Sequence, residues 1–93
     1  MKATLKGLVI AESDDVVENS GYIYFPHAAV RIELLRKTEK TASDLRCPHT
    51  VQFYDVLIDG VSHERAAWAY EVPLASKKET ADRFGFWKDV KVG

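Results

Sequence analysis

The sequence predicts a single mainly β domain of the α+β class, with antiparallel sheets and one or two short helices. Short runs of β-branched and aromatic residues, which favour extended backbone, recur along the whole chain. Turn signals separate these runs, and the strongest is Asp59-Gly60, a pair typical of two-residue hairpin turns. The 93 residues suffice for one domain, 1–93, that buries about 60 to 65% of its unfolded surface around a small core.

The first quarter of the chain is predicted to form four short strands. Lys6-Gly7 separates the first two, and Ser13-Asp14-Asp15 ends the second because short polar side chains bond to nearby backbone. Asn19-Ser20-Gly21 is the turn into the fourth, an aromatic strand that Pro26 ends. The predicted strands are residues 2–5, 8–12, 16–18 and 22–25.

The segment after Pro26 has an ambiguous pattern. Apolar residues at 28, 32 and 35 fit a helix, whereas those at 28, 30, 32 and 34 fit the alternation of a strand. Proline suits a first helical turn, which favours a short helix from about His27 to Leu34. The polar stretch 36–43 is predicted to be a loop with some extended pairing.

The second half carries the strongest strand signals. Residues 50–58 have apolar side chains on both faces, as a central strand does, and Asp59-Gly60 then turns the chain back. A bulge at Glu64-Arg65 is expected to interrupt the return strand, and Pro73 stops it. The segments of the return strand are 61–63 and 66–72.

The C-terminal segment is predicted to contain one helix and a final strand or hairpin. Ser76-Lys77-Lys78-Glu79 matches a capping box, with Ser76 as the N-cap and Glu79 reaching back, so a short helix to about Arg83 is expected. Residues 84–87 and 90–92 supply the final extended segments.

Composition argues against several classes of function. Thirteen lysines and arginines nearly balance fourteen aspartates and glutamates, so the concentrated basic face that nucleic acid requires is not expected. No apolar run approaches about 20 residues and the N-terminus lacks an apolar signal core, so no membrane span is predicted and a cytoplasmic location is expected. The single cysteine allows no internal disulfide and no cysteine-only zinc site.

Cys47 and His49 are the candidate catalytic residues. Cys47 is the one side chain able to act as a strong nucleophile near neutral pH, and His49 lies two positions on, where it could activate the thiol. The alternative is that Cys47 is a small buried apolar residue, as free cysteines commonly are. A metal site needs three or four convergent ligands and the Cys-x-His pair offers two, so no metal and no cofactor are predicted.

Aromatic residues are the candidates for ligand binding. Trp68 and Tyr70 fall on one face of their strand by the period of two, and Tyr54 is expected opposite them across the hairpin, with Tyr24 or Trp87 nearby. The predicted ligand-binding set is Tyr24, Tyr54, Trp68 and Tyr70. Such a group forms either a concave box for a small planar or cationic ligand or the core of a small all-β protein.

Several short motifs occur in a recognisable order. They are Lys2-Ala3-Thr4, Tyr24-Phe25-Pro26, Cys47-Pro48, Tyr54-Asp55-Val56, Ala66-Ala67-Trp68-Ala69-Tyr70 with Pro73, and Phe86-Trp87 with Val90. Together they resemble the bacterial family called domain of unknown function four-two-seven, over essentially the whole chain, and the Ala-Ala-Trp-x-Tyr element is the most specific part. The resemblance implies a β-tent fold, similar in architecture to methionine sulfoxide reductase B and the ligand-binding domain of cereblon.

Three expected properties of such relatives do not carry over to this chain. Relatives in that architecture often hold zinc on paired cysteines, and this chain has one cysteine. Family members usually continue Cys-Pro-aromatic-Lys-Gly, whereas Cys47-Pro48-His49 runs directly into Thr50-Val51 and so lacks that cation. The family is sometimes labelled nucleotidyltransferase-like, but neither a glycine-rich phosphate cradle nor paired carboxylates for a metal is visible in the sequence.

These observations lead to three functional interpretations. The first is a small-molecule-binding β domain whose pocket is bounded by the four aromatic residues and rimmed by Cys47 and His49. The second is a cysteine-dependent enzyme that uses Cys47 with His49 as its base. The third is a structural or interaction module that forms a homodimer through exposed sheet edges.

Overall fold

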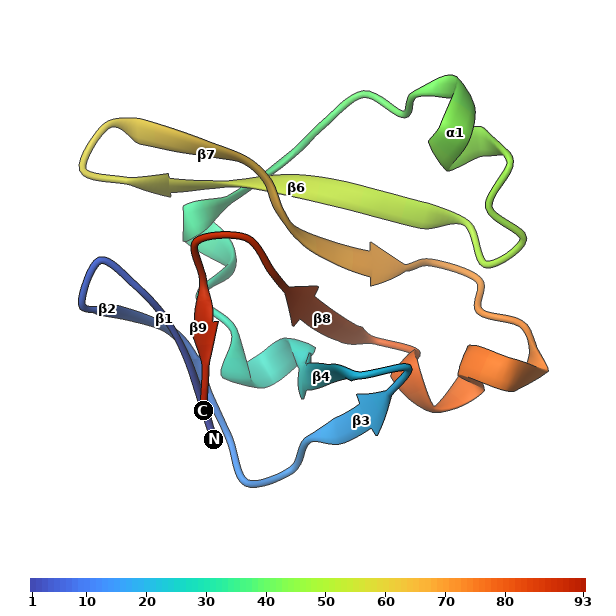
Figure 1. The fold of residues 1–93 in the computed structure, drawn as a ribbon, viewed down its shortest axis with the longest axis horizontal. Coiled ribbons are helices and arrows are strands. Elements are labelled where there is room, and N and C mark those ends of the chain that lie inside the picture. Colours follow the sequence, from blue (N-terminus) through green and yellow to red (C-terminus); the bar gives the residue numbers. More distant parts are fainter.

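The computed structural model describes residues 1–93 and is mainly β, with two antiparallel sheets, one α-helix and three 3₁₀ helices (Figure 1). The larger sheet has six strands in the order β3-β4-β8-β7-β6-β5. These strands are β3 (Val17–Asn19), β4 (Tyr22–Pro26), β5 (Leu35–Lys37), β6 (Val51–Ile58), β7 (Val61–Tyr70) and β8 (Arg83–Phe86). The predicted β6–β7 hairpin is confirmed, and it lies inside the sheet, so β7 has a neighbouring strand on both sides.

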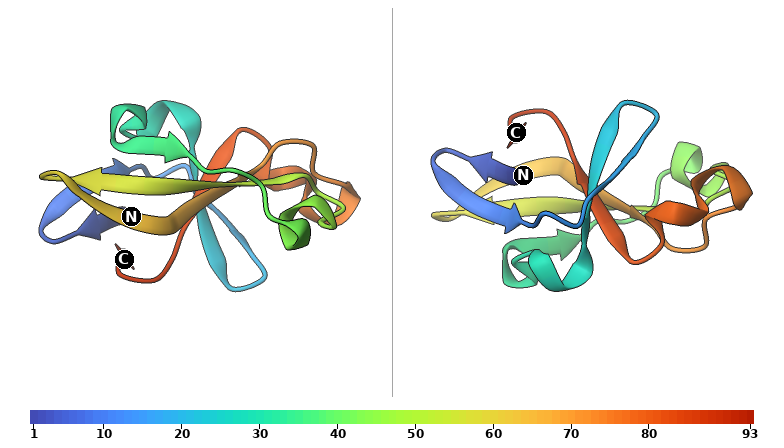
Figure 2. Two further views of the ribbon diagram at one scale, coloured as in Figure 1. Left: turned by 90° about the horizontal axis from the view of Figure 1, so that it is seen from above. Right: turned by 90° about the horizontal axis from the view of Figure 1, so that it is seen from below.

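The smaller sheet joins the two ends of the chain. Its order is β2-β1-β9, with β1 at Lys2–Leu5, β2 at Leu8–Glu12 and β9 at Lys91–Val92. The backbones of Lys2 and Gly93 exchange hydrogen bonds of 3.3 and 2.9 Å. The termini therefore lie side by side, at the same end of the molecule as the β6–β7 turn (Figures 1 and 2).

The main core lies between the smaller sheet and one face of the larger sheet. It contains thirteen buried residues in contact with one another. The smaller sheet supplies Ala3, Leu5, Ile10 and Ala11, and the larger sheet supplies Phe25, Val56, Ile58, Ala66, Ala67, Phe84 and Phe86. Side chains alternate across a strand, so the other face of the larger sheet is left to a different set of residues.

The predicted helix from His27 to Leu34 is wrong. The structure has two 3₁₀ turns instead, η1 (His27–Ala29) and η2 (Ile32–Leu34). Between them Val30 is extended and forms an antiparallel bridge with Ala11. Burial of Val30 against the smaller sheet therefore outweighs the weak helical pattern of this segment.

The capping box of the structure is not the one that the sequence predicted. The predicted N-cap Ser76 lies inside the 3₁₀ helix η3 (Ala75–Thr80), whose N-cap is Leu74, a residue without a polar side chain. Glu79 does not reach back to an N-cap and accepts a hydrogen bond from Asn19. A true capping box opens the one α-helix, α1 (Ala42–Leu45), where Thr41 and Asp44 bond to each other's backbone N–H groups. The stretch 36–43 was predicted to be a loop with some pairing, and β5 confirms the pairing while α1 was missed.

The predicted bulge at Glu64-Arg65 is confirmed. Tyr54 pairs with Ala67 and Val56 pairs with His63, so three residues of β7 lie opposite the single residue Asp55 of β6. The bulge adds two residues to β7, and the alternation of the strand keeps its phase. No helix of the structure combines the length and the apolar character that crossing a membrane requires.

Candidate functional site

Cross-strand register gathers aromatic side chains on the face of the larger sheet that is turned away from the main core. Tyr24 of β4 pairs with Gly85 of β8, Gly85 pairs with Trp68 of β7, and Trp68 pairs with Phe53 of β6. Directly paired residues point to the same side of a sheet, so these four positions form one row across four strands. Val51 and Tyr70 pair with each other and lie two residues beyond Phe53 and Trp68, on one side of this row. Tyr22 lies two residues from Tyr24 on the other side of the row, because β4 and β8 are antiparallel, as are β8 and β7.

Gly85, which has no side chain, leaves room for the indole of Trp68 within this row. A Cβ atom at this position would lie 2.6 Å from Cζ2 and 2.8 Å from Cε2 of Trp68, which is closer than atoms can approach. The indole of Trp68 therefore lies against the backbone of β8 in the space that a side chain would fill. Its ring meets those of Tyr22, Tyr24 and Trp87 edge to face, with centroids 5.0, 5.8 and 5.5 Å apart, an arrangement that favours aromatic pairs.

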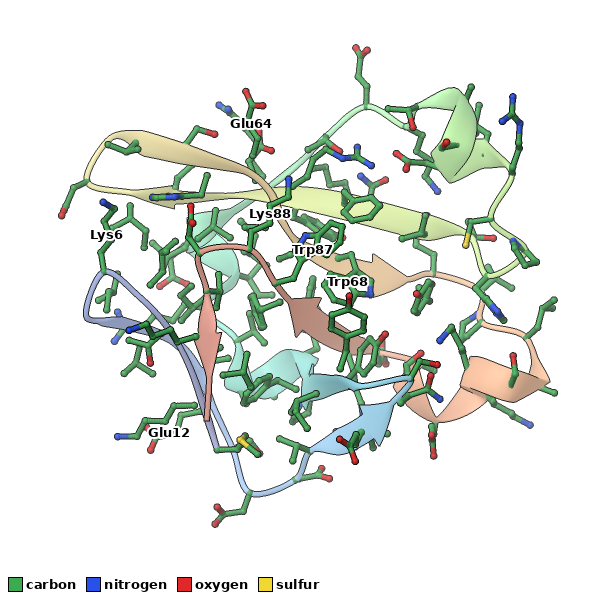
Figure 3. The ribbon with its side chains drawn as sticks, in the orientation of Figure 1. Lys6, Glu12, Glu64, Trp68, Trp87 and Lys88 are labelled. Carbon is green, nitrogen blue, oxygen red and sulfur yellow. The ribbon has the colours of Figure 1, made fainter.

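Six apolar residues line a hollow over this row, which we call the aromatic hollow. They are Tyr22, Val51, Phe53, Trp68, Tyr70 and Trp87, and the hollow has a volume of about 120 Å³. Trp68 is 3% exposed, whereas Tyr22 is 39% exposed. Trp87 follows β8 and is fixed by a hydrogen bond from its indole N–H to the carbonyl of Arg65, so both tryptophans lie together over the strands (Figure 3).

Three cations lie over rings that line the aromatic hollow. The guanidinium carbon of Arg65 is 4.0 Å from the centroid of Phe53. The ammonium nitrogens of Lys77 and Lys88 are 5.4 and 5.5 Å from the centroids of Tyr70 and Trp87. Each cation therefore meets the negative face of one ring.

The three cations differ in how far their charge is neutralised. Arg65 forms an ion pair of 2.7 Å with Asp44, whose side chain is 4% exposed. Lys77 donates instead to the neutral side chains of Asn19 and Ser20, and Lys88 to the backbone carbonyl of Glu64. Neither lysine has a carboxylate within ion-pair distance, so two positive charges at the hollow are unpaired.

Two pKa shifts follow from these surroundings. The hydrogen bond from Arg65 is the main reason that the pKa of Asp44 lies below its usual value. Burial would raise this pKa, but the hydrogen bonds with Arg65 and Thr41 together outweigh that effect. Burial raises the pKa of Tyr24 well above the ordinary value of 10.0. The indole N–H of Trp68 lies near enough to the Tyr24 hydroxyl to oppose that rise, but hydrogen-bond geometry is not reached, and the buried N–H has no partner.

The structure brings together three of the four predicted ligand-binding residues. Tyr24 and Trp68 are buried in one aromatic cluster, and Tyr70 packs against it. The expectation that Tyr54 lies opposite Trp68 is wrong, because Tyr54 pairs with Ala67 and its ring lies 5.3 Å from Phe84 on the other face. Burial, aided by the nearby charge of Glu71, raises the pKa of Tyr54.

Sequence reasoning missed Phe53, Tyr22 and Val51, although a signal for Phe53 was present. The two-residue turn Asp59-Gly60 pairs Ile58 with Val61, so even-numbered residues of β7 pair with odd-numbered residues of β6. A bulge of two residues preserves this relation. Trp68 thus faces an odd-numbered residue, which is Phe53 and not Tyr54.

Cys47 and His49 lie in the loop between α1 and β6, beside the aromatic cluster. Cys47 is partly buried and packs against that cluster. Nδ1 of His49 accepts a hydrogen bond of 2.9 Å from the backbone N–H of Leu74, and the imidazole lies 5.5 Å from the ring of Tyr70. A neutral imidazole that accepts at Nδ1 carries its proton on Nε2, so this arrangement leaves no basic nitrogen for Cys47.

A second hollow shares Tyr70 with the aromatic hollow and is more polar. It has a volume of about 250 Å³ and is lined by His27, Tyr54, Ala69, Tyr70, Glu71, Asp82, Arg83 and Phe84. Two of its charged groups are already engaged, because Arg83 forms an ion pair with Asp15 and Glu71 with Lys40. No three His, Cys, Asp or Glu side chains converge anywhere in the structure as a metal site would need.

A family model described as a domain of unknown function, DUF427, matches residues 1–93. The chain belongs to the DUF427 family. The match spans every strand of both sheets, so the aromatic hollow lies within the DUF427 domain itself. No curated protein matches the chain.

Proposed function

We propose that this DUF427 domain binds a small molecule by seating one planar, ring-sized group in the aromatic hollow. The volume of the hollow, about 120 Å³, is the observation that carries the proposal. An apolar cavity of about 150 Å³ accepts benzene, whereas drug-sized ligands need about 300 Å³ or more. The hollow therefore suits a single ring, with the rest of the ligand outside it.

The position of the aromatic cluster supports binding in addition to packing. The thirteen buried residues of the main core lie on the other face of the larger sheet, so the hollow is separate from the principal core. Its walls are also fixed before any ligand arrives, Trp68 by the backbone of Gly85 and Trp87 by the carbonyl of Arg65. Preorganised walls reduce the entropy that a ligand loses on binding.

The two tryptophans provide the test, because Trp68 and Trp87 are the only ones in the chain and both line the hollow. We expect a titration with benzamide to shift both indole N–H signals in NMR spectra and to saturate at a Kd of about millimolar, as for other ligands of this size. The variant Tyr22→Ala removes one wall that is already partly exposed, and it is expected to weaken binding at least threefold.

The control for this test is Val61→Ala, which truncates an exposed apolar side chain at the β6–β7 turn. It removes a similar kind of surface outside the hollow, and it should leave benzamide binding unchanged. If benzamide shifts neither tryptophan signal, or if Tyr22→Ala and Val61→Ala behave alike, the hollow does not bind rings and the proposal fails.

A further inference from the structure

We infer that the ring seated in the aromatic hollow belongs to an anionic ligand, and that the ligand class is an aromatic carboxylate. This inference rests on the proposed function and adds the sign of the charge to it. The apolar lining of the hollow would receive the ring, and the cations at its border would face the carboxylate.

The first argument is the charge that remains unpaired at the hollow. Asp44 neutralises Arg65, but no carboxylate forms an ion pair with Lys77 or Lys88. The Glu79 carboxylate accepts from Asn19, and Lys88 reaches only the backbone carbonyl of Glu64, so neither glutamate forms an ion pair with these lysines. A bound anion would therefore give either lysine an ion-pair partner that the protein itself does not supply.

The second argument is that this positive charge is local. The chain as a whole has a net charge of −1, with thirteen basic and fourteen acidic side chains. All three cation–ring contacts of the protein nevertheless involve rings that line this one hollow.

The third argument concerns cationic ligands, which the sequence alone left open. Aromatic boxes attract cations through the negative faces of their rings. Here Phe53, Tyr70 and Trp87 each already have a cation of the protein over the ring. A cationic ligand would be repelled by those groups, because like charges close together are unfavourable.

Three ring compounds of similar size and different charge test the inference. The probes are benzoate, benzamide and benzylamine, which at pH 7.5 are negative, neutral and positive. We expect benzoate to bind about tenfold more tightly than benzamide at low ionic strength, and benzylamine to bind more weakly than both. The preference for benzoate should shrink as salt is raised from about 10 mM to 0.5 M, because salt screens exposed charges.

Substitution of the two lysines locates the effect. Lys77→Gln and Lys88→Gln each remove one charge while keeping a long polar side chain, and each is expected to lower the affinity for benzoate about threefold without changing that for benzamide. The matched control is Lys6→Gln, in the turn between β1 and β2, which lies at one end of the molecule and away from the tryptophans (Figure 3). It changes the net charge equally and should have no effect.

The outcomes separate this inference from the proposed function. If benzoate and benzamide bind equally well, or if Lys6→Gln weakens benzoate as much as Lys77→Gln does, the charge inference is overturned while ring binding stands. If benzylamine binds most tightly, the sign of the charge is wrong. If none of the three probes shifts the tryptophan signals, the proposed function and the inference fail together.

Discussion

The absence of a side chain at Gly85 leaves the space that the indole of Trp68 occupies in the wall of the aromatic hollow. The backbone of this residue touches the indole of Trp68, and a methyl group there would meet two atoms of a rigid ring system instead of the end of a flexible chain. Gly85 is also paired with Tyr24 on its other side, so Trp68 has no free space towards β4. The requirement for glycine is therefore one of space, since no unusual φ angle is involved.

We expect Gly85→Ala to reduce the free energy of unfolding by about 1–3 kcal/mol, the usual cost of overpacking a well-filled site. Urea unfolding followed by tryptophan fluorescence measures it. Trp68→Phe provides the control, because the smaller ring leaves room for the methyl group. In the double variant the cost of Gly85→Ala should be smaller than in the wild-type background, and strictly additive costs would contradict the proposed contact.

At the scale of elements, the bulge in β7 links the short helix α1 to the aromatic hollow through one residue. Arg65 has a positive φ of 54°, and its backbone N–H donates to Asp55. Its side chain pairs with Asp44 of α1 and covers the ring of Phe53, while its carbonyl accepts from Trp87. The ion pair of Arg65 and Asp44 thus ties the loop that carries Cys47 to the wall of the hollow.

The low pKa of Asp44 predicts how stability depends on pH. In the unfolded chain this carboxyl has a pKa near its ordinary value of 3.8, whereas in the folded protein the pKa is lower. Between those two pKa values the unfolded state binds more protons than the folded state. The stability that the Asp44 carboxylate contributes is therefore complete above about pH 5 and is lost as the pH falls through the folded-state pKa. Asp44→Asn should therefore reduce the free energy of unfolding at pH 7 and make it fall less steeply as the pH is lowered below about 5.

Urea unfolding at several pH values between 7 and 2.5 checks this prediction, with Asp59→Asn as the control. Asp59 is an exposed aspartate at the β6–β7 turn and has no ion pair. The variant Asp59→Asn should therefore have little effect on how stability falls below about pH 5. If Asp44→Asn and the wild type lose stability in parallel below pH 5, the ion pair with Arg65 contributes nothing measurable.

The elements that the sequence predicted well are those with strong local signals. Asp59-Gly60 and the apolar run before it defined the β6–β7 hairpin, and the polar pair Glu64-Arg65 marked the bulge. The errors arose where distant contacts override local preference. Val30 is held extended by Ala11, and Glu79 bonds to Asn19 instead of capping its own helix, and neither partner can be known from the local sequence.

At the scale of the whole molecule, the larger sheet separates two sets of side chains. One face carries the main core, which it shares with the smaller sheet, and the other carries the aromatic cluster. The period of two correctly placed Trp68 and Tyr70 on one face, and Tyr24 was expected near them from another strand. Tyr54 was assigned to the wrong face, because the register of the hairpin pairs Trp68 with Phe53 and Tyr54 with Ala67. The cations at the hollow come from η3, the bulge and the segment after β8, so only the fold brings them together.

The sheet edges bear on the interpretation of this chain as a homodimer. Both edge strands of the larger sheet, β3 and β5, have only three residues. Short edge strands offer few free backbone groups to a second chain and are one way in which proteins limit pairing between edges. The edges of the larger sheet thus give little support to a dimer formed by strand addition.

Because the main core and the aromatic cluster lie on opposite faces of the larger sheet, we expect stability and ligand binding to respond to different substitutions. Ile10→Val removes one methylene from the main core and should reduce the free energy of unfolding by about 0.5–1.5 kcal/mol, while leaving the Kd for benzamide unchanged in the folded protein. Tyr22→Ala should weaken benzamide binding, and the effects of the two substitutions on stability should add within about 0.5 kcal/mol because the sites share no contacts. Urea unfolding and NMR titration of both single variants and the double variant measure this. A change in Kd of more than twofold in Ile10→Val would mean that the sheet transmits strain between its faces and that the hollow is not independent of the core.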